Sequence, residues 1–254
     1  MKRAALAVVI VAAVALSALA GYHVRQRRAT GHPPGSMTVV VFGDSVTAGY
    51  FEDGVLDQAA GYVERLRGHL IRGNPDCVVN VINAGVAGDT AAVALRRVER
   101  DVLRYEPDLV VVAFGLNDAV AGDPAACRAA TDEIVGRLAA AGVDRVVLVT
   151  PSFLCTRPGL NHGPHAARGA EFAAIQTGGG VAAVAQAVRD VAAGHGLPVA
   201  DVYAEWSRRA AAGQDTDAML SNGLNHPTRD AHAIHAELIS AAVRERWPGP
   251  PRTP

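Results

Sequence analysis

The sequence predicts an α/β fold, a three-layer αβα sandwich built on a five-stranded parallel sheet. Short runs of Val, Ile and Leu are almost continuously apolar, which is typical of strands covered by helices on both faces. Longer stretches with helical spacing of apolar residues separate these runs, and such alternation predicts right-handed crossovers. The expected strands are 38–42, 77–82, 109–114, 145–150 and 197–202.

The expected helices fill the intervals between these strands. In 90–105, for example, apolar residues recur at helical spacing with Arg and Glu between them. A last helix is expected over 228–247, with Asn225 or Thr228 as its N-cap. The other predicted helices are 61–72, 124–141 and 170–194.

One long segment, 151–180, interrupts this regular alternation directly after the fourth expected strand. It contains Phe153, Cys155 and three consecutive glycines, Gly178 to Gly180. Loops at the carboxyl ends of parallel strands form the rim of the ligand site in such sheets. The segment is therefore expected to be a substrate-side lid or wall, with a variable surface insertion as the alternative.

Composition and charge narrow the class of protein. The chain has 254 residues, of which 50% are hydrophobic and 19% charged, and its net charge is −1. These values fit one globular domain and exclude a disordered chain. Charges of both signs are interspersed without a basic stripe, which argues against a nucleic-acid partner.

The N-terminal twenty residues differ from the rest of the chain. Lys2 and Arg3 precede an uncharged stretch, 4–20, which predicts either a cleaved export signal or an uncleaved membrane anchor. In both cases the globular part is expected outside the cytoplasm, secreted or anchored to the outer face of the membrane. The predicted organisation is 1–20 signal or anchor, 21–36 linker, 37–248 globular domain and 249–254 tail.

Three cysteines, Cys77, Cys127 and Cys155, are an odd number for an exported protein. At least one thiol is expected to be unpaired, and one disulfide remains possible among the three. No Cys-x-x-Cys pair or other zinc-ligand spacing occurs. The sequence predicts neither a metal site nor a cofactor.

Four short polar segments each follow, or lie beside, an expected strand end. The first strand runs into Gly43-Asp44-Ser45, a pattern that is also ordinary turn composition when it stands alone. Because the carboxyl ends of parallel strands share one edge, these segments are expected to meet. The other three are the small-residue loop 83–90, the segment 114–118 and the segment 221–227 before the last helix.

Together the four segments resemble the SGNH (GDSL-type) hydrolase superfamily, whose four blocks are marked by Ser, Gly, Asn and His. The resemblance runs from about Met37 to the last helix. It implies a flavodoxin-like sandwich and hydrolysis of ester bonds. The most similar members are of the bacterial lysophospholipase or thioesterase type and the carbohydrate acetylesterase type, and the motifs do not distinguish between them.

The resemblance also implies a role for each matching residue. Ser45 would be the nucleophile, and His226 would take its proton and later protonate the leaving alcohol. The backbone N–H groups of Ser45 and Gly88 and the side-chain amide of Asn117 would line an oxyanion hole. An oxyanion hole requires such groups. A glycine lets the backbone N–H come close to the oxyanion, and an amide side chain donates a hydrogen bond without carrying charge.

One position departs from the family pattern. The superfamily usually has an Asp three residues before the catalytic His, but this chain has Gly223 there. Asn222, one residue earlier, is the candidate to orient His226 as a neutral acceptor. The alternative is a Ser–His pair in which a backbone carbonyl orients the imidazole.

The leading hypothesis is thus an exported serine esterase that acts through an acyl-enzyme, without metal or cofactor. Its partner would be a small-molecule, lipid or glycan ester, and the N-terminal segment could anchor it to a membrane. The second hypothesis is a non-catalytic glycan- or wall-binding domain on the same scaffold. A third, a nucleotide-binding domain, lacks a phosphate-loop signature around Gly85 to Gly88.

Overall fold

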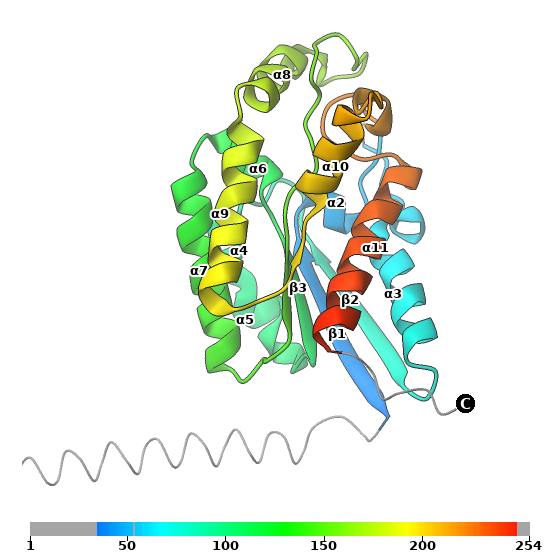
Figure 1. Ribbon diagram of the computed structural model, residues 1–254, viewed down its shortest axis with the longest axis vertical. Helices are drawn as coiled ribbons and strands as arrows, with labels where there is room; N and C mark the ends of the chain where they lie inside the picture. Colours follow the sequence, from blue (N-terminus) through cyan, green and yellow to red (C-terminus); the bar gives the residue numbers. More distant parts are fainter. Residues whose placement is uncertain (1–34, 53, 248–254) are drawn as a thin grey trace, which may run out of the picture. The chain divides into compact units, whose positions relative to one another are not determined.

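The computed structural model describes residues 35–52 and 54–247. At its centre five parallel strands form one sheet in the order β2-β1-β3-β4-β5 (Figure 1). This confirms the predicted parallel sheet, although the last strand has two residues where the sequence predicts six. The strands are β1 (Ser36–Gly43), β2 (Val78–Gly85), β3 (Leu109–Ala113), β4 (Val146–Val149) and β5 (Val199–Ala200).

Helices cover both faces of this sheet. Figure 1 shows α3 (Tyr62–Gly73) and α11 (Arg229–Arg246) on one face, and α7 (Pro124–Ala140) and α9 (Gly180–His195) on the other. The three-layer αβα sandwich is therefore confirmed. The shorter helices are α2 (Ser45–Ala48), α4 (Ala91–Ala94), α5 (Val98–Asp101), α6 (Leu116–Ala121), α8 (Gly169–Thr177) and α10 (Val202–Ala211).

The register of the strands brings three of the four polar segments together. Gly43 at the end of β1 is paired with Gly85 of β2 and with Ala113 of β3. The strands β1 and β3 are almost wholly buried by the covering helices, which explains their continuous Val composition. Because the three strands end level with one another, the residues that follow them lie at one edge of the sheet.

Two expected helices are broken in the structure. The stretch 90–105 is divided into α4, α5 and two 3₁₀ turns, and 170–194 is divided into α8 and α9. Gly179, with φ of +85°, separates the second pair, because only glycine adopts this conformation readily. The rim segment 151–180 contains the whole of α8. The helices α6 and α10 are not predicted by the sequence pattern.

The last helix packs on α3 through histidines. The structure buries His232 completely and leaves only 4% of His235 exposed. Nδ1 of His232 accepts a hydrogen bond from the backbone N–H of Tyr62 at 3.1 Å. Burial lowers the pKa of His235 to about 4 and that of His232 well below its usual value, so both rings are neutral.

Several sequence predictions concern residues that the structure does not describe. The export signal or anchor, 1–20, and most of the linker lie outside the described residues, and so does the C-terminal tail. Within 35–52 and 54–247, none of the helices has the length and apolarity that crossing a membrane requires. All three cysteines are free thiols, so the possible disulfide is not formed.

Candidate active site

The turn after β1 is held by a buried carboxyl. Asp44 is the N-cap of α2, and its Oδ1 accepts a hydrogen bond from the backbone N–H of Val46 at 2.9 Å. Burial raises the pKa of Asp44 to about 7, against the lowering effect of that hydrogen bond. The cap makes Ser45 the first residue of α2, as expected for a turn fixed by Asp44.

Ser45 lies against the histidine of the last polar segment. Nε2 of His226 is 3.1 Å from Oγ of Ser45, although 181 positions separate the two residues. Nδ1 of the same ring is 2.8 Å from the backbone carbonyl oxygen of Phe51. A carbonyl oxygen can only accept, so Nδ1 carries the proton and the lone pair of Nε2 faces the serine hydroxyl. This tautomer is the one that a general base needs.

The prediction that Asn222 orients the imidazole directly is wrong. Its Oδ1 accepts hydrogen bonds from the backbone N–H groups of Leu224, Asn225 and His226, each at 3.0 Å. Its Nδ2 donates to Oδ1 of Asn225 at 2.9 Å. An Asn in a tight turn commonly binds the backbone in this way. Asn222 therefore shapes the loop that carries His226, and the alternative, a backbone carbonyl on Nδ1, is the arrangement found.

The glycine in place of the expected Asp is explained by the rim segment. Gly223 has φ of +63°, in the left-handed region, and a Cβ atom there would lie 2.6 Å from the carbonyl oxygen of Leu160. Asp217 fastens the same rim segment, because its carboxylate accepts from the N–H and the hydroxyl of Thr156, both at 2.7 Å. The close packing of 151–168 on the histidine loop thus excludes a side chain at position 223.

The predicted oxyanion residues follow β2 and β3. Gly88 is exposed, and a Cβ atom at this position would have no other atom within 4 Å. Its φ of +83° lies in the left-handed region, so the backbone conformation is what favours glycine here. Nδ2 of Asn117, at the start of α6, donates to the carbonyl oxygen of Asp89 at 3.0 Å. This contact holds the amide beside the Asp89–Thr90 peptide, one residue after Gly88. Ser45 is the first residue of α2, so its own N–H has no partner within that helix.

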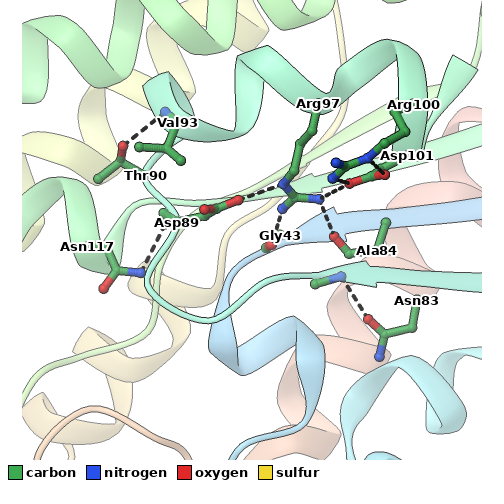
Figure 2. A network of polar contacts seen from close by, with 11 residues as sticks. Gly43, Asn83, Ala84, Asp89, Thr90, Val93, Arg97, Arg100, Asp101 and Asn117 are labelled. Atoms are coloured by element: carbon green, nitrogen blue, oxygen red, sulfur yellow. Dashed lines mark hydrogen bonds and ion pairs between the residues drawn. The ribbon is translucent and has the colours of Figure 1, made fainter.

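A buried arginine joins the strand ends beneath these residues (Figure 2). The guanidinium of Arg97 donates to the carbonyl oxygens of Gly43 at 3.0 Å and Ala84 at 2.8 Å. It also forms an ion pair with Asp89 at 2.6 Å and a second with Asp101 at 3.2 Å. The turn that carries Ser45 and the loop of Gly88 are therefore tied to one rigid cation.

Sequence reasoning missed two parts of this site. Phe51 contributes only a backbone atom to the contact with His226, and a backbone atom leaves no trace in the sequence. The sequence indicates a role for Arg97 only weakly, by its place eight residues after Asp89 on a stretch that is predicted to be a helix. Asp118 accepts from the N–H of Ala91 at 3.0 Å and so steadies α4.

The rim segment contacts the loop that carries His226. The N–H of Cys155 donates to the carbonyl oxygen of Leu224 at 2.7 Å, so the rim segment lines the histidine loop. His162 and His165 are exposed on it. Within the part of the chain that the structure describes, no group of three or more His, Cys, Asp or Glu side chains is placed to hold a metal ion.

Comparison with known proteins gives a family and several relatives. The model of the GDSL-like lipase/acylhydrolase family matches residues 41–234. Esterase TesA of Pseudomonas aeruginosa is 34% identical over 87 residues, which are 34% of this chain and 40% of that protein. An arylesterase of Vibrio mimicus is 33% identical over 89 residues, 35% of this chain and 42% of that protein. These matches thus span less than half the length of either relative.

Solved structures agree over a longer stretch. A lipase/acylhydrolase from Enterococcus faecalis has a TM-score of 0.64 and 27% identity, with 86% of this chain and 100% of that chain covered. The acetylxylan esterase Axe2 of Geobacillus stearothermophilus has a TM-score of 0.63, covering 82% of this chain and 94% of that one. Its identity is 20%, so this likeness concerns the fold.

Proposed function

The chain belongs to the GDSL-like lipase/acylhydrolase family, and from this premise we propose that it is a serine esterase that hydrolyses carboxylic esters through an acyl-enzyme on Ser45. One observation carries the proposal. The imidazole of His226 lies between the Ser45 hydroxyl, 3.1 Å away, and a carbonyl acceptor, 2.8 Å away. This geometry fixes the tautomer that can remove the serine proton.

The first half of the reaction forms an acyl-enzyme. Oγ of Ser45 attacks the ester carbonyl carbon while Nε2 of His226 takes the hydroxyl proton. The proton then passes to the leaving alcohol oxygen as the ester C–O bond breaks. In the second half, water repeats the attack with His226 again as base, and the acid is released. The Phe51 carbonyl holds the imidazole throughout, and it accepts from Nδ1 without taking the proton.

The negative charge on the tetrahedral oxygen needs donors. We assign them to the N–H groups of Ser45 and Gly88 and to the amide of Asn117. An amide has two N–H bonds, so one serves the Asp89 carbonyl and the second is available for the oxyanion. Arg97 supports this arrangement by holding the strand ends from which two of these residues extend.

Replacing Asn117 with Ala is expected to lower kcat by about 10²–10³-fold, roughly 3–4 kcal/mol of transition-state stabilisation, with a small change in KM. The reason is that the amide would bind the oxyanion more strongly than the neutral ester. Steady-state kinetics with a p-nitrophenyl ester measure both constants. Asn80→Ala, an exposed position on β2, is the control and should keep wild-type rates. A kcat within threefold of wild type in Asn117→Ala would remove this residue from the oxyanion hole.

The proposed function itself is tested by a series of p-nitrophenyl esters of increasing acyl length. Turnover of one or more of them by the purified chain is expected, with lower or no turnover of matched amides. An acetate optimum would favour glycan or small-ester deacylation, and a long-chain optimum would favour lipid substrates. Absence of hydrolysis across the whole series would reject the esterase and favour the alternative, a non-catalytic glycan- or wall-binding domain.

We also propose that the protein acts outside the cytoplasm, secreted or anchored to the outer face of the membrane. The support is the pattern of Lys2 and Arg3 followed by the uncharged stretch 4–20. Protease added to intact cells should digest the globular domain, unless the domain is released into the medium and is found there. A domain that stays protected until the cells are lysed would contradict the proposal.

A further inference from the structure

The residue whose carbonyl faces His226 has a side chain held by the last helix. Phe51 is completely buried. The guanidinium carbon of Arg229 lies 4.6 Å from the centre of its ring, a cation–π contact. The ring of His232 lies 4.7 Å from the same ring, centre to centre, at an interplanar angle of 44°. Both contacts come from α11, so Phe51 is fixed relative to that helix.

The same arginine also binds the loop that follows Phe51. Nη1 of Arg229 is 3.0 Å from Oε1 of Glu52, and Nη2 is 3.5 Å from Oδ2 of Asp57. Within the loop, the N–H of Phe51 donates to the carbonyl oxygen of Val55 at 3.0 Å. One guanidinium therefore contacts the aromatic ring and two carboxylates of a single short loop.

These contacts join the general base to its acceptor through a short path. His226 lies three residues before Arg229, which is the first residue of α11. From Arg229 the path continues through the Phe51 ring to the Phe51 carbonyl and back to Nδ1 of His226. A movement of the loop against α11 would therefore lengthen the Nδ1–O contact directly.

A neutral carbonyl that accepts from Nδ1 must be held in position more precisely than a carboxylate in the same place. A carboxylate attracts an imidazolium over a distance by its charge, whereas a neutral carbonyl acts through a hydrogen bond that weakens steeply with distance and angle. Beyond the buried Phe51 the loop is exposed at Val55 and Leu56, so contacts from outside the loop help to decide where the carbonyl lies. Something must hold the carbonyl in place, and Arg229 has the contacts to do so.

We propose that Arg229 is a positioning residue for the general base: by stacking on Phe51 and pairing with Glu52 and Asp57, it holds the Phe51 carbonyl against Nδ1 of His226. The proposal rests on the proposed function, because His226 needs positioning only as a base. In this role Arg229 acts through Phe51 and not on the reacting atoms of the ester. Its side chain is 45% exposed, and exposed ion pairs contribute little to folding stability, so its replacement leaves a folded protein.

The kinetic test compares Arg229→Gln and Arg229→Lys with the wild-type chain. Arg229→Gln is expected to lower kcat about tenfold, since small displacements of catalytic groups have effects of this size, with KM within twofold. Arg229→Lys keeps the charge but not the planar stacking, so it should recover part of kcat. The control is Arg137→Gln, whose ion pair with Glu133 is comparably exposed, 48% and 54% against 45% and 46% for Arg229 and Glu52.

A spectroscopic test needs no turnover. A proton held between Nδ1 and a carbonyl oxygen should give a downfield ¹H NMR signal that exchanges slowly with water, and His226→Ala identifies it by its loss. In Arg229→Gln the signal is expected to broaden or to exchange faster, and in Arg137→Gln it should not change. If the wild-type chain hydrolyses no ester, the esterase proposal fails and this signal alone decides the role of Arg229.

Two results would overturn the positioning role. One is a kcat of Arg229→Gln within twofold of wild type, in a preparation whose activity depends on Ser45. The other is a wild-type protein without the Nδ1–H signal, or a signal that Arg229→Gln leaves unchanged. Either result would leave the esterase proposal standing on its own experiments.

Discussion

Ser45→Ala is expected to lower kcat for ester hydrolysis by about 10⁶-fold, the size of effect seen when a serine nucleophile is removed. The expectation follows from the position of the hydroxyl, 3.1 Å from Nε2 of His226 at the carboxyl edge of the sheet. His226→Ala should cost nearly as much. Because the two residues would act as one unit, the double variant should be little worse than either single variant.

The same variants must be shown to be folded. Removing the Ser45 hydroxyl deletes one hydrogen bond, worth about 1 kcal/mol, so the melting temperature should change little. Ser207→Ala is a suitable control, since Ser207 donates to a backbone carbonyl of α10 and has no assigned part in the reaction, so the variant should keep full activity. Near-wild-type hydrolysis by purified Ser45→Ala would refute the assignment of the nucleophile.

Gly223→Asp is expected to destabilise the protein by about 3–5 kcal/mol and to lower activity, even though it restores the residue that the family usually has. Two costs add up at this position. A left-handed φ of +63° strains any side chain, and the Cβ would lie 2.6 Å from the carbonyl oxygen of Leu160. Chemical denaturation measures the loss of stability, and hydrolysis of a p-nitrophenyl ester measures the activity.

A matched variant separates the two costs. Gly213 also has a left-handed φ, +83°, but a Cβ atom added to it would have no other atom within 4 Å. Gly213→Asp should therefore lose only the backbone cost, about 1–2 kcal/mol, and keep its activity. Equal losses in the two variants, or a gain of activity in Gly223→Asp, would mean that the rim segment does not exclude the carboxylate.

The sheet could be predicted from the sequence because its inner strands, β1, β3 and β4, are buried on both faces. Their Val-rich runs have no competing interpretation once helical stretches alternate with them. The break in 90–105 could not be predicted, since that stretch contains no glycine or proline. It falls at Arg97, whose buried side chain binds Gly43, Ala84 and Asp89, and this tertiary contact overrides the local helical preference.

The parts of the candidate site that consist of side chains can be predicted from the sequence. Ser45 and His226 lie at hydrogen-bond distance, and the amide of Asn117 donates to the carbonyl oxygen of Asp89, next to Gly88. The prediction for Asn222 is wrong because Asn-Gly is first of all a turn sequence, and its side chain satisfies the backbone of that turn. The acceptor that orients His226 is a backbone atom, which only the folded structure reveals.

Covalent labelling with a fluorophosphonate probe tests the central claim, a serine activated by His226, most directly, because such probes react with a serine only when a base activates it. We expect one label per chain, located by peptide mass spectrometry on the segment that contains Ser45. Labelling should be absent in Ser45→Ala and much slower in His226→Ala. No labelling of the folded wild-type chain, or a label on another residue, would contradict the claim.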